Sequence, residues 1–321
     1  MPTTLVYIED HEGEATKGSL GVLSKAASLG LDVAAVLLGS GVRELAEGLG
    51  AYGASTVYVA DDEALAAPLP QPRVDVLAKL AGDAGIENVL FGASVLTADV
   101  AAGLAARLDA GLNWDLTDLE AGDFGLVGTR PALQDTVLVE VGWTSTPRLA
   151  LFRTGAFEPS EGDGGQVRVS DVSVEIEDWS TATAMIEQAH EEASGPSIED
   201  ADVVVAGGRG LGEAGNFSLL EDLAKALGGA VAATRAVVDA GWYPYAAQVG
   251  QTGRVVSPKL YLACGISGAI QHKVGMQSSG TIVAINKDPN APIFEYSDLA
   301  VVGDLHEIVP KLTKLVSEAK Q

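Results

Sequence analysis

The sequence predicts two α/β domains joined by a short linker, and three observations lead to this fold class. The 321 residues, 47% apolar and 20% charged, are enough to form two hydrophobic cores. Short β-branched runs alternate with Ala- and Leu-rich amphipathic stretches, which is the pattern of parallel βαβ units. A polar, acidic stretch with a Gly-Pro pair interrupts this alternation. We therefore predict an N-terminal domain at 1–191, a linker at 192–200 and a C-terminal domain at 201–321.

The first domain has the pattern of a nucleotide-binding-like parallel sheet with helices on both faces. We expect its first strands at Leu5–Ile8, Val33–Leu38, Thr56–Val59 and Asn88–Phe91. We expect its helices at Gly18–Leu29, Val42–Leu49, Val74–Ala81 and Leu96–Leu108. From 111 to 174 the helical period fades, and we expect an antiparallel addition with strands at Thr136–Val141, Arg148–Phe152 and Val167–Val174.

The second domain returns to strand–helix alternation, which predicts a compact, doubly wound α/β domain. We expect its strands at Asp202–Ala206, Leu260–Ala263, Thr281–Asn286 and Ala300–Val302, with further short elements between Val231 and Val238. We expect its helices at Asn216–Leu227, Ser267–Val274 and Asp304–Ala319.

Composition and charge exclude several classes of function. Asp plus Glu number 44 and Lys plus Arg 20, a net charge of -24, so we expect no binding of nucleic acid or of an anionic membrane surface. One cysteine, Cys264, cannot form an internal disulfide or hold an iron–sulfur cluster. The four histidines lack the spacing of metal ligands, so we expect no metal site.

The start of the chain predicts a cytoplasmic location. It has the pattern of a first strand rather than of a basic leader, and the first arginine is Arg43. No uncharged apolar run reaches the roughly 18 residues needed to span a bilayer. We expect no direct insertion into a membrane.

The charge is unevenly distributed along the chain. Residues 1–200 carry 33 acidic and 10 basic side chains, whereas residues 201–321 carry 11 acidic and 10 basic. One interpretation is that the acidic half keeps the protein in solution. The other is that the near-neutral half holds an anionic ligand that the acidic half would repel.

A glycine-rich turn, GGRGLGEAG at 207–215, follows the first strand of the second domain. Glycines there permit positive φ and bring N–H groups close to a phosphate, and Arg209 can add a charge-assisted contact. The GxGxxG match within 210–215 lacks the acidic residue that binds a ribose, because Thr234 and Arg235 occupy that part of the sequence. The alternative is a turn that is glycine-rich only for tightness.

Two later strand ends also suit an anionic ligand. A glycine turn at Gly265 and a helix start at Ser267 would aim several N–H groups at one point. His272, one turn further on, would face the same crevice, although a lone histidine is more often an ordinary core or surface residue. Asn286 ends the next strand, where ligands bind in open α/β sheets, or it only starts the turn at 288–289.

These loops by themselves identify only a nucleotide-like ligand. An NAD(P)-linked oxidoreductase or a transhydrogenase-type dinucleotide-binding protein would use the same glycine-rich turns. A nucleotide-sensing or structural module built on the first domain is a further alternative.

Four segments together are similar to the α subunits of electron transfer flavoproteins, the ETF alpha / FixB family. They are GGRGLGEAGNF at 207–217, TRAVVDAGW at 234–242, QVGQTGRVVSPKLYLACGISGAIQH at 248–272 and SSGTIVAINKDPNAPIFEYSDLAVVGDL at 278–305. They cover nearly all of the second domain, while the first domain matches in size, element order and its LVYIED start.

The resemblance implies a heterodimer with an electron transfer flavoprotein β subunit and one FAD in the C-terminal, FAD-binding domain. It implies an electron carrier rather than an enzyme with its own substrate. Its partners would be acyl-CoA or other flavin dehydrogenases, as in fatty acid β-oxidation, and a membrane quinone oxidoreductase.

The resemblance also implies which residues contact FAD: Arg209, Thr234, Arg235, Val249, Gly250, Gln251, Thr252, Ser267, Gly268, Ala269, Ile270, Gln271, His272, Asn286, Asp304 and Leu305. Three of them would surround the isoalloxazine ring. We expect His272 to supply a donor or cation at the N1/C2=O edge, Arg235 a fixed positive charge, and Thr252 a hydrogen bond to N5.

Overall fold

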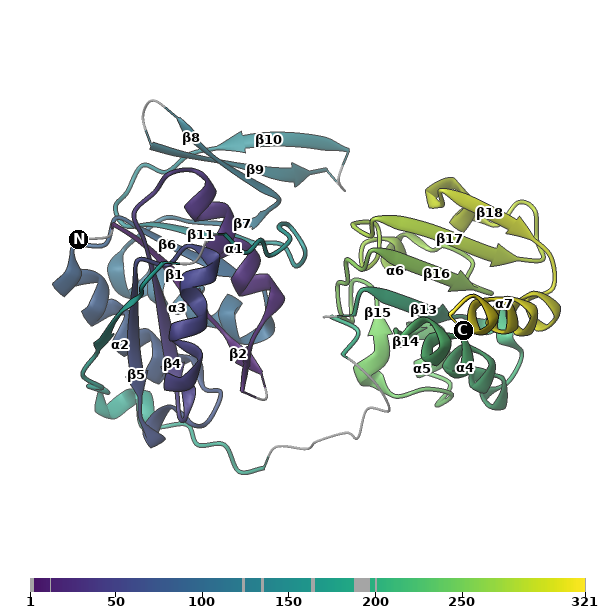
Figure 1. Ribbon diagram of the computed structural model, residues 1–321, viewed down its shortest axis with the longest axis horizontal. Helices are drawn as coiled ribbons and strands as arrows, with labels where there is room; N and C mark the ends of the chain where they lie inside the picture. Colours follow the sequence, from purple (N-terminus) through teal and green to yellow (C-terminus); the bar gives the residue numbers. More distant parts are fainter. Residues whose placement is uncertain are drawn as a thin grey trace. The chain divides into compact units, whose positions relative to one another are not determined.

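A computed structural model describes residues 3–11, 13–122, 125–133, 136–162, 165–187, 197–199 and 201–320. The chain forms two compact units, Met1–Gln188 and Ala189–Gln321 (Figure 1). The linker expected at 192–200 lies almost wholly outside the described residues, so its bounds stay a prediction.

The first unit is built on a seven-stranded sheet in which every pair of neighbours is parallel. Its order is β12-β5-β4-β1-β6-β11-β7. The strands are β1 (Thr4–Ile8), β4 (Val33–Gly39), β5 (Thr56–Asp61), β6 (Asn88–Gly92), β7 (Leu112–Leu116), β11 (Arg148–Phe152) and β12 (Arg168–Asp171).

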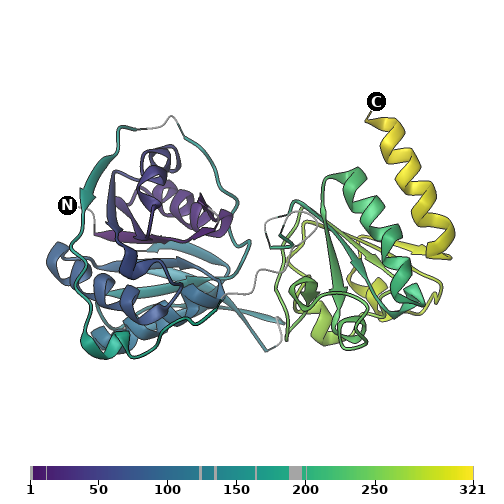
Figure 2. The same ribbon diagram turned by 90° about the horizontal axis from the view of Figure 1, so that it is seen from below.

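Helices bury both faces of this sheet, and so its central strands are continuously apolar. In β1, Leu5 and Tyr7 face one core with α2 (Pro70–Ala84) and α3 (Val95–Leu108). The alternate residues of β1 face the other core with α1 (Lys17–Ser28). Figure 2 shows α1 on one side of the sheet and α2 and α3 on the other.

A separate three-stranded antiparallel sheet, in the order β10-β9-β8, confirms the antiparallel addition. Its strands are β8 (Asp118–Gly122), β9 (Gly125–Ala132) and β10 (Val137–Val141), and a small ribbon pairs β2 (Asp10–His11) with β3 (Glu14–Ala15). Two strands assigned to the addition instead join the parallel sheet, namely β11 and β12. Apolar alternation marks a strand but does not say which neighbour it pairs with, and this is why the assignment was wrong.

The prediction of a helix at Val42–Leu49 is wrong. The segment forms two 3₁₀ turns, η1 (Val42–Leu45) and η2 (Glu47–Tyr52). Gly48 and Gly50 lower the helical propensity, and a Cβ at Gly50 would come within 2.5 Å of Val167. Two further 3₁₀ turns are η3 (Glu63–Leu65) and η4 (Asp178–Thr181).

The second unit contains a six-stranded, wholly parallel sheet in the order β15-β14-β13-β16-β17-β18. Numbered from its own first strand, this is 3-2-1-4-5-6, the order of the doubly wound dinucleotide-binding fold. The strands are β13 (Val203–Gly207), β14 (Ala230–Thr234), β15 (Gln248–Val249), β16 (Leu260–Cys264), β17 (Thr281–Asn286) and β18 (Leu299–Val302). The predicted fold class is therefore confirmed for both units.

Two long helices, α4 (Phe217–Leu227) and α7 (Leu305–Ala319), lie side by side on one face of this sheet (Figure 1). The opposite face packs against loops that carry Met276 and Ile293. The remaining elements are short: α5 (Arg235–Val238), α6 (Ile270–Lys273), η5 (Arg209–Leu211), η6 (Ala214–Asn216), η7 (Tyr245–Ala247) and η8 (Pro292–Tyr296).

The helix expected at Ser267–Val274 is shorter than predicted. It begins at Ile270, and Ser267 does not cap it. Gly265 (φ +64°) and Gly268 (φ +92°) both have positive φ, and Ala269 has an extended ψ of 146°, so the chain enters the helical region only at Ile270. In the described part of the chain, no helix is both long and apolar enough to cross a membrane.

Candidate functional site

The candidate residues of the second unit come from loops at one edge of its sheet. Because all six strands are parallel, their carboxyl ends lie at the same edge. The strand order reverses between β13 and β16, and in open α/β folds ligands bind in the crevice at this point. The loops that leave these two strands start at Gly208 and Gly265.

These two loops are in direct contact through glycines. The N–H of Gly208 donates to the carbonyl of Cys264 over 3.0 Å, and the N–H of Gly210 donates to Gly265 over 2.9 Å. A Cβ on Gly208 would lie 2.4 Å from the Gly265 carbonyl oxygen, and one on Gly210 would lie 2.6 Å from the Gly265 Cα. Side chains at these positions would push the loops apart, so tight packing is one reason for the glycines.

Four N–H groups of the first loop are already paired with protein, which corrects one expectation in part. Gly208, Gly210, Leu211 and Gly212 all donate to protein carbonyls. What this loop does offer is Arg209, whose side chain is exposed and forms no ion pair within the described residues. This guanidinium can add a charge-assisted contact to a bound anion.

The second loop provides a run of five consecutive free amides. In the described part of the chain, the N–H groups of Ser267 through Gln271 have no protein acceptor, and four of these five residues are exposed. The N–H of Ile293 donates to the carbonyl of Ser267 over 3.0 Å and anchors the segment. A run of unpaired N–H groups is a favourable site for phosphate oxygens. We expected a helix N-terminus here, but α6 has only four residues, so the donors are loop amides.

Asn286 supports the second loop from the end of β17. Its Nδ2 donates to the carbonyl of Ile266 over 2.9 Å, and its Oδ1 accepts from the N–H of Asp288 over 3.0 Å. The side chain therefore both holds the loop and starts the turn at 288. Next to it, Leu305 begins α7, and its Cδ2 would lie 2.8 Å from a Cβ on Gly265. Asp304 caps α7, with Oδ1 accepting from His306 over 2.9 Å.

A third loop, after β15, adjoins α6. Val249 pairs with Thr234 in the sheet, and the N–H of Gln251 donates to the carbonyl of Gln271 over 2.7 Å. Gly250 (φ +141°) is in a conformation that favours glycine, and a Cβ there would lie 2.8 Å from that same carbonyl oxygen.

Thr252 is held by two side chains that the sequence analysis did not select. Its carbonyl accepts from Tyr245 Oη and from Gln248 Nε2, each over 3.0 Å, and Gln248 Nε2 is 3.2 Å from its Oγ1. Gln248 is 2% exposed. The signal in the sequence that could have selected it is a glutamine directly before the VGQT segment. Arg235, the first residue of α5, is exposed and its Nε lies 3.2 Å from Asp239 Oδ2.

His272 differs most from the expectation. Its side chain is 6% exposed and faces the protein, with Nε2 3.0 Å from Tyr261 Oη and Nδ1 3.1 Å from the Val249 carbonyl oxygen. Burial lowers the pKa of His272 to about 4, so the ring is neutral at pH 7. An imidazolium facing the crevice is therefore not what this structure contains. Tyr261, which the sequence analysis passed over, is its main side-chain partner.

Comparison with known proteins identifies this arrangement. The family described as "Electron transfer flavoprotein domain" matches residues 4–177, and "Electron transfer flavoprotein FAD-binding domain" matches residues 197–277. The chain belongs to the electron transfer flavoprotein alpha-subunit family. FAD is the cofactor of its second domain.

Several curated relatives match over nearly the full length. An "Electron transfer flavoprotein subunit alpha" of Mycobacterium leprae is 42% identical over 323 residues, covering 100% of each chain. One from Thermoanaerobacterium thermosaccharolyticum is 38% identical over 322 residues, covering 98% of each chain. "Protein FixB" of Clostridium saccharobutylicum is 40% identical and covers 98% of this chain and 96% of its own.

The residues present in this electron transfer flavoprotein chain fit FAD. The glycine contact between the loops at Gly208 and Gly265 leaves no room for side chains at the strand-order reversal. The unpaired amides of 267–271 and the guanidinium of Arg209 are the donors that a diphosphate requires.

The first unit has its own strand-order reversal, between β1 and β6, but its chemistry is different. Ser94 Oγ there donates to Glu9 Oε1 over 2.9 Å, and the Glu9 N–H donates to Ser19 Oγ over 3.0 Å. A Cβ on Gly92 would lie 2.8 Å from the backbone of Gly18, so α1 packs directly on the end of β6. A carboxylate and a closely packed helix occupy the place where a phosphate would bind.

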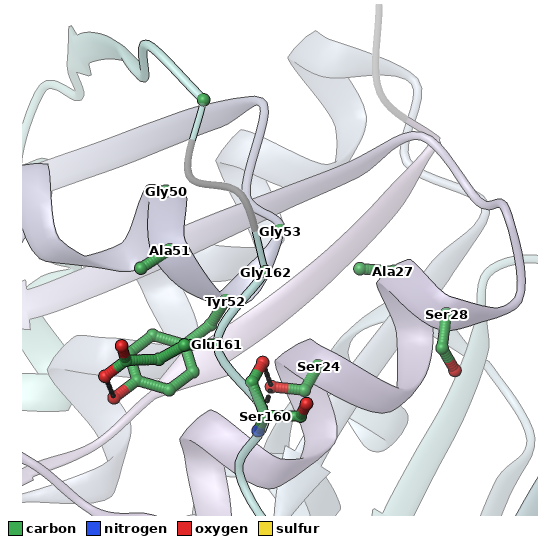
Figure 3. Close-up of a pocket in the computed structure, with 11 residues that line it drawn as sticks. Ser24, Ala27, Ser28, Gly50, Ala51, Tyr52, Gly53, Ser160, Glu161 and Gly162 are labelled. Atoms are coloured by element: carbon green, nitrogen blue, oxygen red, sulfur yellow. Dashed lines mark hydrogen bonds between the residues drawn. The ribbon is translucent and has the colours of Figure 1, made fainter.

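A hollow of about 450 Å³ also lies in the first unit (Figure 3). Tyr52 Oη donates to Glu161 Oε1 over 3.1 Å, and Ser24 exchanges hydrogen bonds with the backbone of Ser160. The described lining has a carboxylate and no cation, so it does not suit a dinucleotide: Ser24, Ala27, Ser28, Gly50, Ala51, Tyr52, Gly53, Ser160, Glu161, Gly162 and Gly165.

Proposed function

We propose that this chain is the α subunit of a heterodimeric electron transfer flavoprotein, which carries electrons and has no substrate turnover of its own. The observation that supports it best is the run of unpaired amides at 267–271, at the carboxyl edge of a doubly wound sheet, within the stretch that matches the family's FAD-binding domain. The dinucleotide would lie across the crevice between the loops after β13 and β16.

The residues proposed to contact FAD are those that the family resemblance implies, except that His272 does not supply the expected imidazolium. The amides of 267–271 and Arg209 would bind the diphosphate, and Asn286 would hold the loop that presents the amides. The residues in question are Arg209, Thr234, Arg235, Val249, Gly250, Gln251, Thr252, Ser267, Gly268, Ala269, Ile270, Gln271, His272, Asn286, Asp304 and Leu305.

Bound FAD supplies reversible electron transfer, and the chain's own residues set the field around its ring. Because His272 is neutral, the positive charge that favours the reduced ring would come from Arg235. Gln248 Nε2 can only donate, so Thr252 Oγ1 accepts from it and directs its own hydroxyl proton elsewhere. That proton is the one we assign to ring N5.

The proposed partners follow from the family. The second subunit would be an electron transfer flavoprotein β subunit, the electron donors acyl-CoA or other flavin dehydrogenases, and the acceptor a membrane quinone oxidoreductase. A cytoplasmic location stays a prediction that cell fractionation checks.

The deciding experiment is co-expression of the chain with a candidate β subunit, followed by extraction and identification of the bound cofactor. We expect a yellow heterodimer that contains FAD. A colourless complex, or one that releases a nicotinamide dinucleotide instead, would contradict the proposal and favour the NAD(P)-linked alternative.

A further inference from the structure

Two buried polar side chains of the second unit pair with each other. Tyr261, in the middle strand β16, is 0% exposed, and His272, on α6, is 6% exposed. The Tyr261 Oη lies 3.0 Å from His272 Nε2. A buried hydroxyl and a buried imidazole each require a partner, because an unpaired polar group inside a protein is costly.

The second ring nitrogen fixes where the proton lies. His272 Nδ1 is 3.1 Å from the carbonyl oxygen of Val249, which can only accept. A neutral ring carries one N–H, so that proton must be on Nδ1. Nε2 is then an acceptor, and the hydroxyl of Tyr261 donates to it. Tyr261 therefore donates to His272, and His272 donates to the carbonyl of Val249.

These two hydrogen bonds join two segments that border the proposed FAD site. Val249 is the last residue of β15 and leads directly into the loop 250–252. The same loop meets α6 a second time, where the N–H of Gln251 donates to the carbonyl of Gln271. A Cβ on Gly275 would lie 2.3 Å from the N atom of Gly250, so the two segments are in backbone contact.

We propose that Tyr261 is a positioning residue of the FAD site: its hydroxyl holds His272 as the neutral Nδ1–H tautomer, which fastens the loop after β15 to α6. The expected effect on FAD binding rests on the proposed function, whereas the tautomer of His272 does not. Among the described residues Tyr261 forms no hydrogen bond with loop 250–252 or with the exposed amides, and it acts through His272.

The test uses the full-length chain with its β subunit, labelled with ¹⁵N in histidine. We expect the ring nitrogens of His272 to show a single tautomer at pH 7, protonated at Nδ1 and unprotonated at Nε2. Removal of one hydroxyl in Tyr261→Phe should shift the Nε2 resonance and weaken FAD binding about three- to tenfold. A tyrosine that only filled space in the core would leave both the nitrogen shifts and the FAD affinity unchanged.

Tyr243→Phe is the matched control. Tyr243 is a partly buried tyrosine of the same unit. Its Oη donates to Glu221 over 3.3 Å and its ring stacks on Phe217, and no histidine among the described residues bonds to it. This variant should leave the His272 resonances and the FAD dissociation constant unchanged.

Two results would overturn the inference. One is a wild-type His272 that is doubly protonated at pH 7 or protonated at Nε2. The other is a Tyr261→Phe variant with either wild-type nitrogen shifts or wild-type FAD affinity. If the wild-type chain bound no FAD, the proposed function would fail, and the wild-type ring resonances would still decide the tautomer.

Discussion

The charge of a single residue in this chain is set by its surroundings, and His272 is the clearest case. An exposed histidine titrates near pH 6.5, but burial lowers the pKa of this one to about 4. The hydrogen bond to the carbonyl of Val249 opposes that shift without cancelling it. The site is therefore provided with cations by Arg209 and Arg235, whose side chains are exposed.

The first prediction concerns pH. Between about pH 6.5 and pH 4 the unfolded chain binds a proton at His272 while the folded chain does not, so the stability that this group confers is present above pH 6.5 and is lost as the pH falls. Over this pH range the free energy of unfolding should fall by about 3 kcal/mol because of this group. Urea unfolding at several pH values should show this slope in the wild type and lack it in His272→Gln. Identical slopes in both proteins would contradict the assignment.

The second prediction concerns the glycine contact. In Gly210→Ala the new Cβ would meet Gly265 at 2.6 Å, so we expect a loss of about 1–3 kcal/mol in the free energy of unfolding and less FAD retained per chain. Gly215→Ala is the control, since nothing lies within 4 Å of a Cβ there. Unfolding curves and flavin absorbance measure both effects. Equal flavin content in the two variants would show that the contact is not needed.

At the scale of elements, side-chain caps and buried partners decide where segments begin and how they are held. Ser94 caps α3: its Oγ accepts from the Thr97 N–H over 3.0 Å, and Thr97 Oγ1 accepts from the Ser94 N–H over 2.7 Å. Both partners lie within four residues of sequence. Asp75 acts over a longer range, because on α2 it binds Arg107 of α3 and the N–H of Glu177.

The third prediction is for this cap. Ser94→Ala should lower the free energy of unfolding of the first unit by about 1–2 kcal/mol, because it leaves the Thr97 N–H without its acceptor and removes the hydroxyl that donates to Glu9. Chemical denaturation followed by far-ultraviolet circular dichroism measures it. Ser28→Ala, an exposed serine in the last turn of α1, should cause no such loss.

The fourth prediction concerns the segment 175–181. Asp75 Oδ1 lies 2.7 Å from Arg107 Nη2, its Oδ2 accepts from the Glu177 N–H, and Arg107 stacks on Trp179. Asp75→Ala should therefore cost about 3 kcal/mol. It should also raise amide exchange in 175–181. Asp83→Ala, whose carboxylate is exposed and 3.7 Å from Lys79, should change neither property.

Across the whole molecule, two units of related topology differ in electrostatics. Both sheets reverse strand order near their centres, yet residues 1–200 carry 33 acidic and 10 basic side chains and residues 201–321 carry 11 and 10. The first unit places Glu9 at its reversal, whereas the second places free amides there. An anionic dinucleotide is therefore favoured in the second unit.

The fifth prediction compares one arginine from each unit. Arg209→Ala should weaken FAD binding about tenfold or more, because Arg209 has no ion-pair partner among the described residues and is available to a phosphate. Arg43→Ala should not, because its guanidinium is 2.7 Å from Asp171 Oδ1. Fluorescence titration of FAD measures both. Equal losses would place the dinucleotide elsewhere.

Local sequence patterns determined much of this protein. Apolar runs located β1, β4, β6, β13, β16 and β17 within a residue or two at most ends, because a strand buried on both faces must be apolar throughout. The same patterns missed the strands between 112 and 132 and the two-residue β15, whose residues are partly polar or too few. Glycine positions marked the loops of the site.

Only the tertiary structure decided what those loops offer. Which neighbour a strand joins, which amides are already paired, and which way His272 faces depend on residues apart in the chain, such as Gly210 with Gly265 and Val249 with His272. A sequence records the groups that can form hydrogen bonds. Their availability to a ligand is settled when the fold brings some of them together and leaves others, here the amides of 267–271, exposed.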